Sequence, residues 1–293
     1  MTEQTAAAIY DLGYQRYTGV RRGRLYAIRA LLAFTYRSAF GIGRGQKAKT
    51  MPSVLTGVVY LWAAGQIMFA SSAGLTEFIN YANFFEFTTL IVALFAAAQA
   101  PECIVTDKQQ GVISLYLSRP LYASDYALAK IGGLTAAMLV ITLGPQLLLF
   151  AGKMAISASP WSAFEGEWTK LFPIVGGTVL ASVFIASVAL LLSSFTSRRG
   201  YGTAAVIVFF LLAPVVVNMF RAVTTGGVRR YSLLLHPMYL MVGFANWLFD
   251  IEAKRRTVVG RADLPGSTYL MALVMYSVLC VVLLMRRVRR LDA

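Results

Sequence analysis

Residues 101–130 read PECIVTDKQQGVISLYLSRPLYASDYALAK, and they separate two apolar runs, 80–101 and 124–151. Each run is long enough for an α-helix to cross a hydrocarbon core of about 30 Å. The helix formed by the run 80–101 is expected to end or bend at Pro101, because proline is tolerated only in the first turn of a helix or at a break. The chain would then form a short segment outside the membrane and re-enter near residue 124.

The rest of the chain follows the same pattern. Of the 293 residues, 58% are hydrophobic and 14% are charged, whereas about 25% of the residues of a soluble domain are charged. The sequence predicts an all-α, polytopic membrane protein, with an amino-terminal segment 1–50 and a transmembrane domain 51–293. Six apolar runs are predicted to span the membrane, at 51–72, 80–101, 124–151, 170–195, 202–222 and 267–285.

Basic residues beside the spans predict their orientation, because cytoplasmic loops are enriched in Lys and Arg. The amino-terminal segment, the 196–201 turn and the tail from Arg286 are basic, so both termini are expected in the cytoplasm. The 223–266 connection is then extracellular. Its apolar run 231–249 could be a seventh span, and the charge distribution does not decide this. His236 and Pro237 within that run favour a re-entrant or interfacial hairpin before the last span.

A basic amphipathic helix is predicted before the first span, at 24–40. One face carries apolar or small side chains and another carries arginines. Such a helix is expected to lie in the membrane interface with its arginines on anionic lipid, although packing on a partner protein is compatible with the same pattern. The first face is formed by Leu25, Ile28, Leu32, Tyr36 and Ala39, and the second by Arg22, Arg29 and Arg37.

The sequence argues against catalysis by this chain. Gly41 is followed at the fifth position by Gln46, so the spacing of a phosphate-binding loop fails. A single histidine excludes a two-histidine metal site, and no nucleophile with its base can be recognised. The two cysteines do not predict a disulfide framework. The net charge of +14 is explained by basic residues beside the spans, so no nucleic-acid partner is expected.

Two ionisable residues lie more than one helical turn inside predicted spans and are candidates for a transport path. Glu86 lies near the outer end of the second span, and Lys130 lies near the cytoplasmic end of the third. Lys130 is expected to extend its ammonium group to the cytoplasmic surface. A structural carboxylate that faces water is an equally good explanation of Glu86.

The stretch from Asp107 to Ser118 predicts a short helix in the excursion. Val112, Leu115 and Ser118 share one side of this helix, and Asp107 near its start suits the helix dipole. Pro120 then ends it. The helix would form a compact cytoplasmic knob between two spans, either to transmit motion from a soluble partner or as an ordinary turn.

This stretch resembles the coupling region of the ABC-2 family of ABC transporter permeases. That region has an acidic residue, a glycine a few positions later, a short helix, a Leu-Ser-Arg-Pro-Leu turn and a lysine at the start of the third span. The amino-terminal sequence YDLGYQRYTGVRRGR, residues 10–24, is similar to the opening of one bacterial branch of the family. The matching residues of the coupling region are Asp107, Gly111, Leu117, Ser118, Arg119, Pro120, Leu121 and Lys130.

The resemblance implies a bacterial inner-membrane exporter built from two permease chains and two separate ABC ATPase subunits. A coupling helix at about 103–119 would dock on the ATPase, with Asp107 and Gly111 shaping it and residues 117–121 turning the chain back into the bilayer. ATP and Mg²⁺ would bind the ATPase, with no cofactor in this chain. Gln109 and Gln110 stand where the family often has a glutamate, which argues against one salt bridge to the ATPase.

Several alternatives stay open. The second permease can be an identical copy or a sister chain, with an identical copy preferred. The chain can instead be a secondary transporter or channel that works through Glu86, or a membrane scaffold without transport. The resemblance does not select a substrate among lipids, peptides, drugs and lipid-linked sugars.

Overall fold

The computed structural model describes residues 23–74, 78–117, 121–251 and 258–292. Every regular element in these ranges is a helix, and none is a strand. Six helical segments are long and apolar enough to cross a membrane, which confirms the all-α, polytopic class. They are α2 (Gln46–Ala73), α3 (Tyr81–Gln109), α5 (Ala123–Ile156), α6 (Pro160–Glu167) continued by α7 (Leu171–Ser194), α8 (Arg199–Val223) and α12 (Gly266–Asp292).

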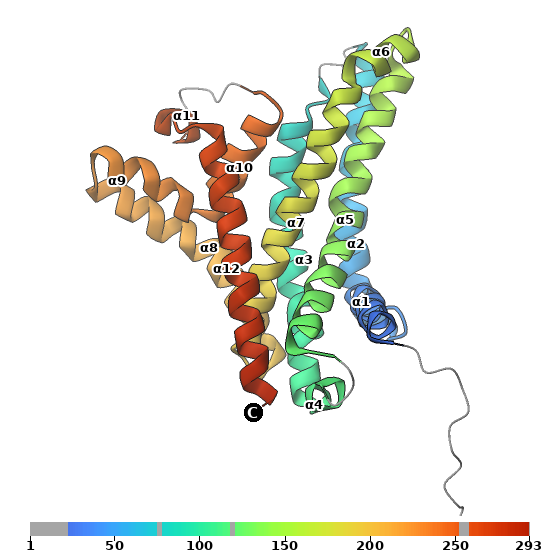
Figure 1. Cartoon of the computed structure of the whole chain (residues 1–293). Coiled ribbons are helices and arrows are strands. Elements are labelled where there is room, and N and C mark those ends of the chain that lie inside the picture. The colour runs from blue at the N-terminus through green and yellow to red at the C-terminus, as the bar shows by residue number, and fades with distance from the viewer. Residues whose placement is uncertain (1–22, 75–77, 118–120, 252–257, 293) are drawn as a thin grey trace, which may run out of the picture.

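The spans form a bundle around α3 and α7, which are the most buried of the six (Figure 1). α2 and α5 pack on one side of this pair, and α8 and α12 pack on the other. Four alanines of α3, Ala93, Ala96, Ala97 and Ala100, are buried within the chain, so these small residues serve packing inside the bundle. α2 and α8 bury the smallest share of their apolar residues and expose broad apolar faces.

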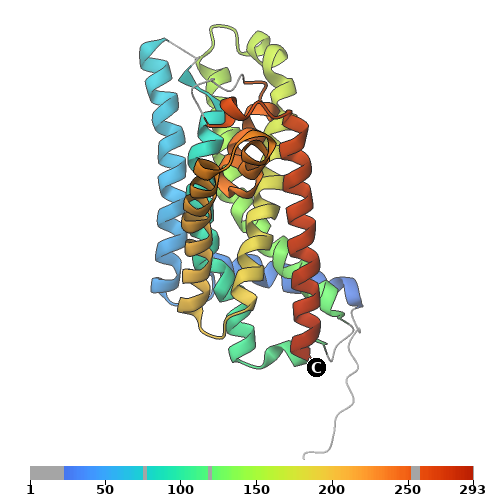
Figure 2. The same ribbon diagram turned by 90° about the vertical axis from the view of Figure 1, so that its left-hand side faces the viewer.

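The helix before the first span, α1 (Arg24–Ala39), lies across the bundle at the end where α4 and the carboxyl terminus are found (Figure 2). It packs on α5 and α3. A Cβ atom on Gly133 of α5 would lie 2.7 Å from the carbonyl oxygen of Leu32 and 2.6 Å from the Cβ of Thr35. Glycine therefore allows the close approach of α1 to α5.

The predicted hydrophobic face of α1 is turned toward the bundle for most of its length. Ile28, Leu32 and Tyr36 pack against the core and Ala39 is fully buried, whereas Leu25 is exposed. Arg29 and Arg37 are exposed, and Arg22 lies outside the described residues. Contact of α1 with lipid stays a prediction.

The run 231–249 does not span the bundle. It is divided between a 3₁₀ turn, η3 (Ser232–Leu235), and α10 (Pro237–Leu248), whose 12 residues are about 18 Å long. Pro237 occupies the first helical position, and His236 Nδ1 accepts the N–H of Tyr239 at 3.1 Å. Together with α9 (Gly226–Tyr231) and α11 (Val258–Ala262), α10 covers the end of the bundle away from α4. The described part of the chain therefore holds six candidate spans.

The second span was predicted to end or bend at Pro101, and its helix does not end there. α3 continues through Pro101 to Gln109, so the predicted coupling helix, 103–119, loses its first residues to α3 and is reduced to α4 (Val112–Leu117). The Pro101 ring packs on α8 at Gly202, where an added Cβ would be 3.0 Å from the ring. Because Cys103, Ile104 and the residues after them are buried against neighbouring helices, tertiary packing maintains the helix beyond the proline.

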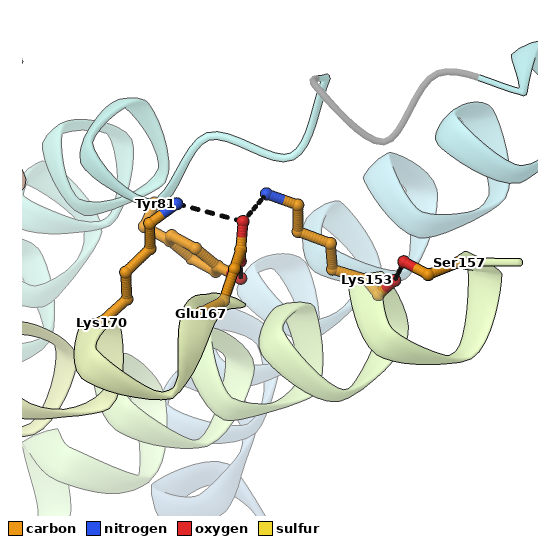
Figure 3. A network of polar contacts seen from close by, with 5 residues as sticks. All are labelled: Tyr81, Lys153, Ser157, Glu167 and Lys170. Carbon is orange, nitrogen blue, oxygen red and sulfur yellow. Dashed lines mark hydrogen bonds and ion pairs between the residues drawn. The ribbon is translucent and has the colours of Figure 1, made fainter. Parts of the chain in front are cut away.

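An ionic cluster connects the helices at the end away from α4. Glu167 at the end of α6 contacts Lys153 of α5 and, at 3.0 Å, Lys170 (Figure 3). Tyr81 at the start of α3 donates its hydroxyl to the same carboxylate at 3.1 Å. The cluster fixes the ends of α3, α5 and α7 relative to one another, and no sequence pattern predicted it.

Candidate functional site

The end of α3, the helix α4 and the start of α5 form the candidate site. α3 ends at Gln109, and Gly111 then reverses the chain with φ +65° before α4 begins. That backbone conformation is costly for residues with a Cβ atom. The predicted role of Gly111 in shaping the short helix therefore has a structural basis.

α4 has a buried side and an exposed side. Ile113 is buried at 5% exposure, and α4 packs against α3 and α12. Val112 is half-buried and Leu115 is 64% exposed, so the two do not form one buried face. Leu121, after the turn, is buried. The Leu117 side chain and residues 118–120 (Ser118, Arg119 and Pro120) lie outside the described part of the structure.

A buried ion pair lies directly behind α4. Lys130 Nζ is 2.7 Å from Asp107 Oδ2, and their side chains are 1% and 7% exposed. Tyr126 donates its hydroxyl to the same oxygen of Asp107 at 2.8 Å. The Lys130 ammonium also lies 5.8 Å from the ring centroid of Phe34 in α1, within the range of a cation–π contact. This cluster joins α3, α5 and α1 at one point.

Two expectations about these residues are wrong. Lys130 does not extend to the surface, because the Asp107 carboxylate satisfies its charge inside the bundle. Asp107 does not start a coupling helix, because it belongs to the last turns of α3. A carboxylate near a helix carboxyl terminus is disfavoured by the helix dipole, and here the ammonium group compensates for that position.

A second pair fastens α1 to the beginning of α5. Arg24 donates Nε and Nη2 to the two carboxylate oxygens of Asp125, at 2.8 and 2.7 Å. The guanidinium also lies 4.3 Å from the centroid of the Tyr122 ring. Asp125 accepts the backbone N–H of Tyr122 at 3.0 Å and so caps α5. The hydrogen bond from Arg24 to Asp125 raises the pKa of Arg24 above its ordinary value.

Glu102 joins α3 to two further segments and was not predicted to be important. Its Oε2 accepts from Arg44, in the turn between α1 and α2, at 2.7 Å. Its Oε1 accepts from Arg199, at the start of α8, at 2.9 Å. The only feature in the sequence that could have pointed to Glu102 is its position directly after Pro101. Its partners are distant in the chain, so the sequence alone does not reveal the pairing.

Lys108 completes the attachments of α3. Its Nζ donates to the carbonyl oxygens of Ser194 and Thr196 at 2.9 and 2.7 Å, at the carboxyl end of α7. A cation there satisfies terminal carbonyls and suits the helix dipole. We call Glu102, Asp107 and Lys108 together the α3 junction. It connects the helix in front of α4 to α5, α7, α8 and the α1–α2 turn.

Glu86 is far from this site. It is exposed on the surface of α3, about 30 Å along the helix from Asp107. The structure therefore does not bring together the two residues predicted for a transport path. A role of Glu86 in transport stays a prediction.

The arrangement is suited to transmitting a displacement between helices. Among the described residues, no group of three or more His, Cys, Asp or Glu side chains could hold a metal ion. The polar groups at the α3 junction are paired with groups on other helices, and α4 presents an exposed apolar side chain at its tip. A force on α4 would therefore be transmitted to several spans at once.

The comparisons with known proteins gave one family. The family model described as ABC-2 family transporter protein matches residues 16–292. No curated protein matches the chain. The match covers α4, the α3 junction and all six spans.

Proposed function

Because this chain belongs to the ABC-2 family of transporter proteins and is thus an ABC transporter permease, we propose that it couples transport to ATP hydrolysis in a separate ATPase subunit that docks on α4. The observation that carries the proposal is the α4 hairpin. It is a short helix at one end of the bundle, with an exposed leucine at its tip and its base attached to several spans through the α3 junction.

The surface of α4 supports docking. Ile113 anchors the helix to the bundle, while Leu115 offers an apolar side chain at 64% exposure. An exposed large apolar residue on a short helix that projects from the bundle fits a hydrophobic groove on a partner. The remaining predicted docking residues, Leu117 to Pro120, follow directly in the chain and complete the proposed contact.

The α3 junction supports transmission of force. If the ATPase moves α4, the end of α3 moves with it because α4 follows directly after the Gly111 turn. Asp107 would then pull α5 through Lys130, and Lys108 would pull α7 through the carbonyl of Ser194. The proposed cycle thus converts closure of the ATPase into displacement of three spans.

The proposed assembly contains two ATPase subunits and a second permease chain. ATP and Mg²⁺ would bind the ATPases, since the sequence of this chain lacks a phosphate-binding loop. The apolar faces of α2 and α8 are consistent with a second chain on one side and lipid on the other. An identical second copy is our preferred form, and export is the proposed direction.

The proposed localisation is the bacterial inner membrane, with both termini in the cytoplasm. Its support is the distribution of charge. Basic residues of α1 and of the carboxyl-terminal tail lie at the α4 end of the bundle (Figure 1), and cytoplasmic segments are rich in Lys and Arg. The opposite end would face outward.

Retention of the ATPase on α4 tests the proposal. We would purify the tagged full-length chain from its native membrane and quantify a co-purified P-loop ATPase for wild type and Leu115→Arg. Leu235→Arg is the matched control, because Leu235 has similar exposure, 59%, at the other end of the bundle. We expect Leu115→Arg to lose at least about 90% of the ATPase, because it places a charge in an apolar contact.

Both variants must reach the membrane at wild-type level, as measured by blotting of the membrane fraction. Equal ATPase recovery from wild type and Leu115→Arg would refute docking on α4. Recovery of the folded chain alone, from wild type as well, would refute the ATP-driven function altogether. Ion-coupled transport through Glu86 would then be tested in proteoliposomes.

A further inference from the structure

Four arginines surround one cavity at the end of the bundle away from α4. The cavity has a volume of about 670 Å³. Its walls come from the end of α8, from α9 and from α11. The basic residues that line it are Arg221, Arg229, Arg230 and Arg261, and Asn218 adds a polar side chain.

The positive charge of this cluster is not compensated within the described residues. None of its four guanidinium groups forms an ion pair there. Asp263 supplies the one acidic side chain of the described lining, and its backbone carbonyl oxygen accepts a hydrogen bond from Arg230. Nη1 of Arg221 and Nε of Arg230 are buried and have no hydrogen-bond partner among the residues that the structure describes. Buried donors of this kind require an acceptor.

The charges also act on one another. Arg221 and Arg229 line the same cavity, so their positive charges repel each other. Burial lowers the pKa of His236 to about 4, and the positive charge of Arg221 acts in the same direction. His236 therefore stays neutral at physiological pH and adds no charge to the cluster. An anion between the arginines would remove the repulsion and satisfy the buried donors.

The chemistry of the walls indicates which anion. A guanidinium group matches the oxygen atoms of a phosphate in a bidentate arrangement, and several arginines together match a phosphate with two negative charges. Val258, Ala262 and Ala222 make part of the lining apolar, and the exposed apolar face of α8 leads up to it. The cavity thus combines a phosphate site with an apolar approach.

We propose that this cavity binds a phosphate-bearing anion. The ligand can be the headgroup of an anionic phospholipid or a soluble phosphate compound, since both offer the same chemistry to the arginines. The proposal concerns binding and holds whether or not the chain works with an ATPase.

Binding to the purified full-length chain tests the site. Two probes separate the sources of phosphate: phosphatidylglycerol against phosphatidylcholine, measured as lipid adducts by native mass spectrometry, and inorganic pyrophosphate, measured by titration calorimetry. The test variant is Arg229→Gln/Arg261→Gln, because both side chains are exposed and their loss should not disturb folding. The control is Arg289→Gln/Arg290→Gln, which removes the same charge from exposed positions at the α4 end.

We expect the test variant to bind at least one probe about tenfold or more weakly than wild type, since each arginine–phosphate contact is charge-assisted. The control should bind like wild type. Arg229→Lys/Arg261→Lys keeps the positive charge but loses the bidentate geometry of the guanidinium group, so its affinity for the probe should lie between those of wild type and the test variant. If the test variant loses only the binding of phosphatidylglycerol, the site is a lipid site. If it loses only the binding of pyrophosphate, the ligand is a soluble phosphate compound. Equal loss in test and control variants, or no binding of either probe to wild type, would overturn the proposal.

Discussion

The buried pair behind α4 gives a quantitative prediction. Lys130 and Asp107 are 2.7 Å apart, with side chains 1% and 7% exposed. Removing one member leaves a charge in a nearly dry environment, so Lys130→Met and Asp107→Asn should each lower the free energy of unfolding by about 3–5 kcal/mol. The double variant removes both charges, and its loss should be at least about 2 kcal/mol smaller than the sum of the two single losses.

The assay is denaturant unfolding of the purified full-length chain in detergent, followed by circular dichroism. Arg199→Gln is the control, because it breaks a pair with Glu102 in which the arginine side chain is 47% exposed. Its loss should be below about 1 kcal/mol. Tyr126→Phe, which removes the hydroxyl donor to Asp107, should lose about 1.5–3 kcal/mol.

Two results would refute this reasoning. One is strict additivity of Lys130→Met and Asp107→Asn in the double variant, because independent side chains do not form a functional pair. The other is a loss for Lys130→Met no larger than that for Arg199→Gln. Either result would mean that the ion pair does not hold α3 to α5, and the proposed route of force through this pair would fail.

Two further predictions concern packing and pH. Gly133→Ala should destabilise the chain by about 1–3 kcal/mol and loosen α1, because its Cβ meets the Leu32 carbonyl at 2.7 Å. Gly132→Ala, which meets only a side-chain carbon of Leu32 at 3.2 Å, should lose less in the same unfolding assay, and equal losses would contradict the close approach. Burial lowers the pKa of His236 to about 4 in the folded chain, whereas the pKa of histidine is about 6.5 in the unfolded chain. Between these two pH values the unfolded chain binds a proton that the folded chain does not bind, so the stability of the fold decreases as the pH falls from about 6.5 to about 4. Between pH of about 7.5 and about 5, the melting temperature should fall less for His236→Gln than for wild type. An equal fall in melting temperature for both proteins would refute the role of the imidazole.

The membrane class was predictable because it depends on composition and length alone. A run such as 202–222 needs no partner to be recognised as a span, since its apolar length matches the bilayer. His236 and Pro237 favoured a re-entrant or interfacial hairpin over a seventh span, because the constraint of proline on its own backbone is local. The interpretation of 231–249 as a segment that does not span rested on such local signals.

Pro101 shows where local signals fail. The same constraint predicted that a helix ends or bends there, and α3 continues for two more turns. The outcome depends on Gly202, which lets α8 pack closely against the proline ring. A contact between residues so far apart in the chain has no signature in a single sequence.

The candidate site was predictable in its parts and not in its connections. Asp107 and Lys130 were both recognised as unusual, but separately, as a helix-start residue and as an interfacial lysine. Their pairing depends on how α3 lies against α5. Glu102 and Lys108 were missed for the same reason, because their partners are 97 and 86 residues away.

These separations have a consequence for how the chain is made. At a synthesis rate of about 5–20 residues per second, the ribosome adds Arg199 roughly 5–20 s after Glu102. During that interval the end of α3 is already at the membrane and Glu102 can pair with Arg44, which precedes it in the chain. Arg199 and the carbonyl groups that will satisfy Lys108 do not yet exist. Lys130 arrives much earlier, so the buried aspartate is neutralised first. Biogenesis should therefore proceed through a half-built intermediate in which the α4 end of the bundle is loosely held.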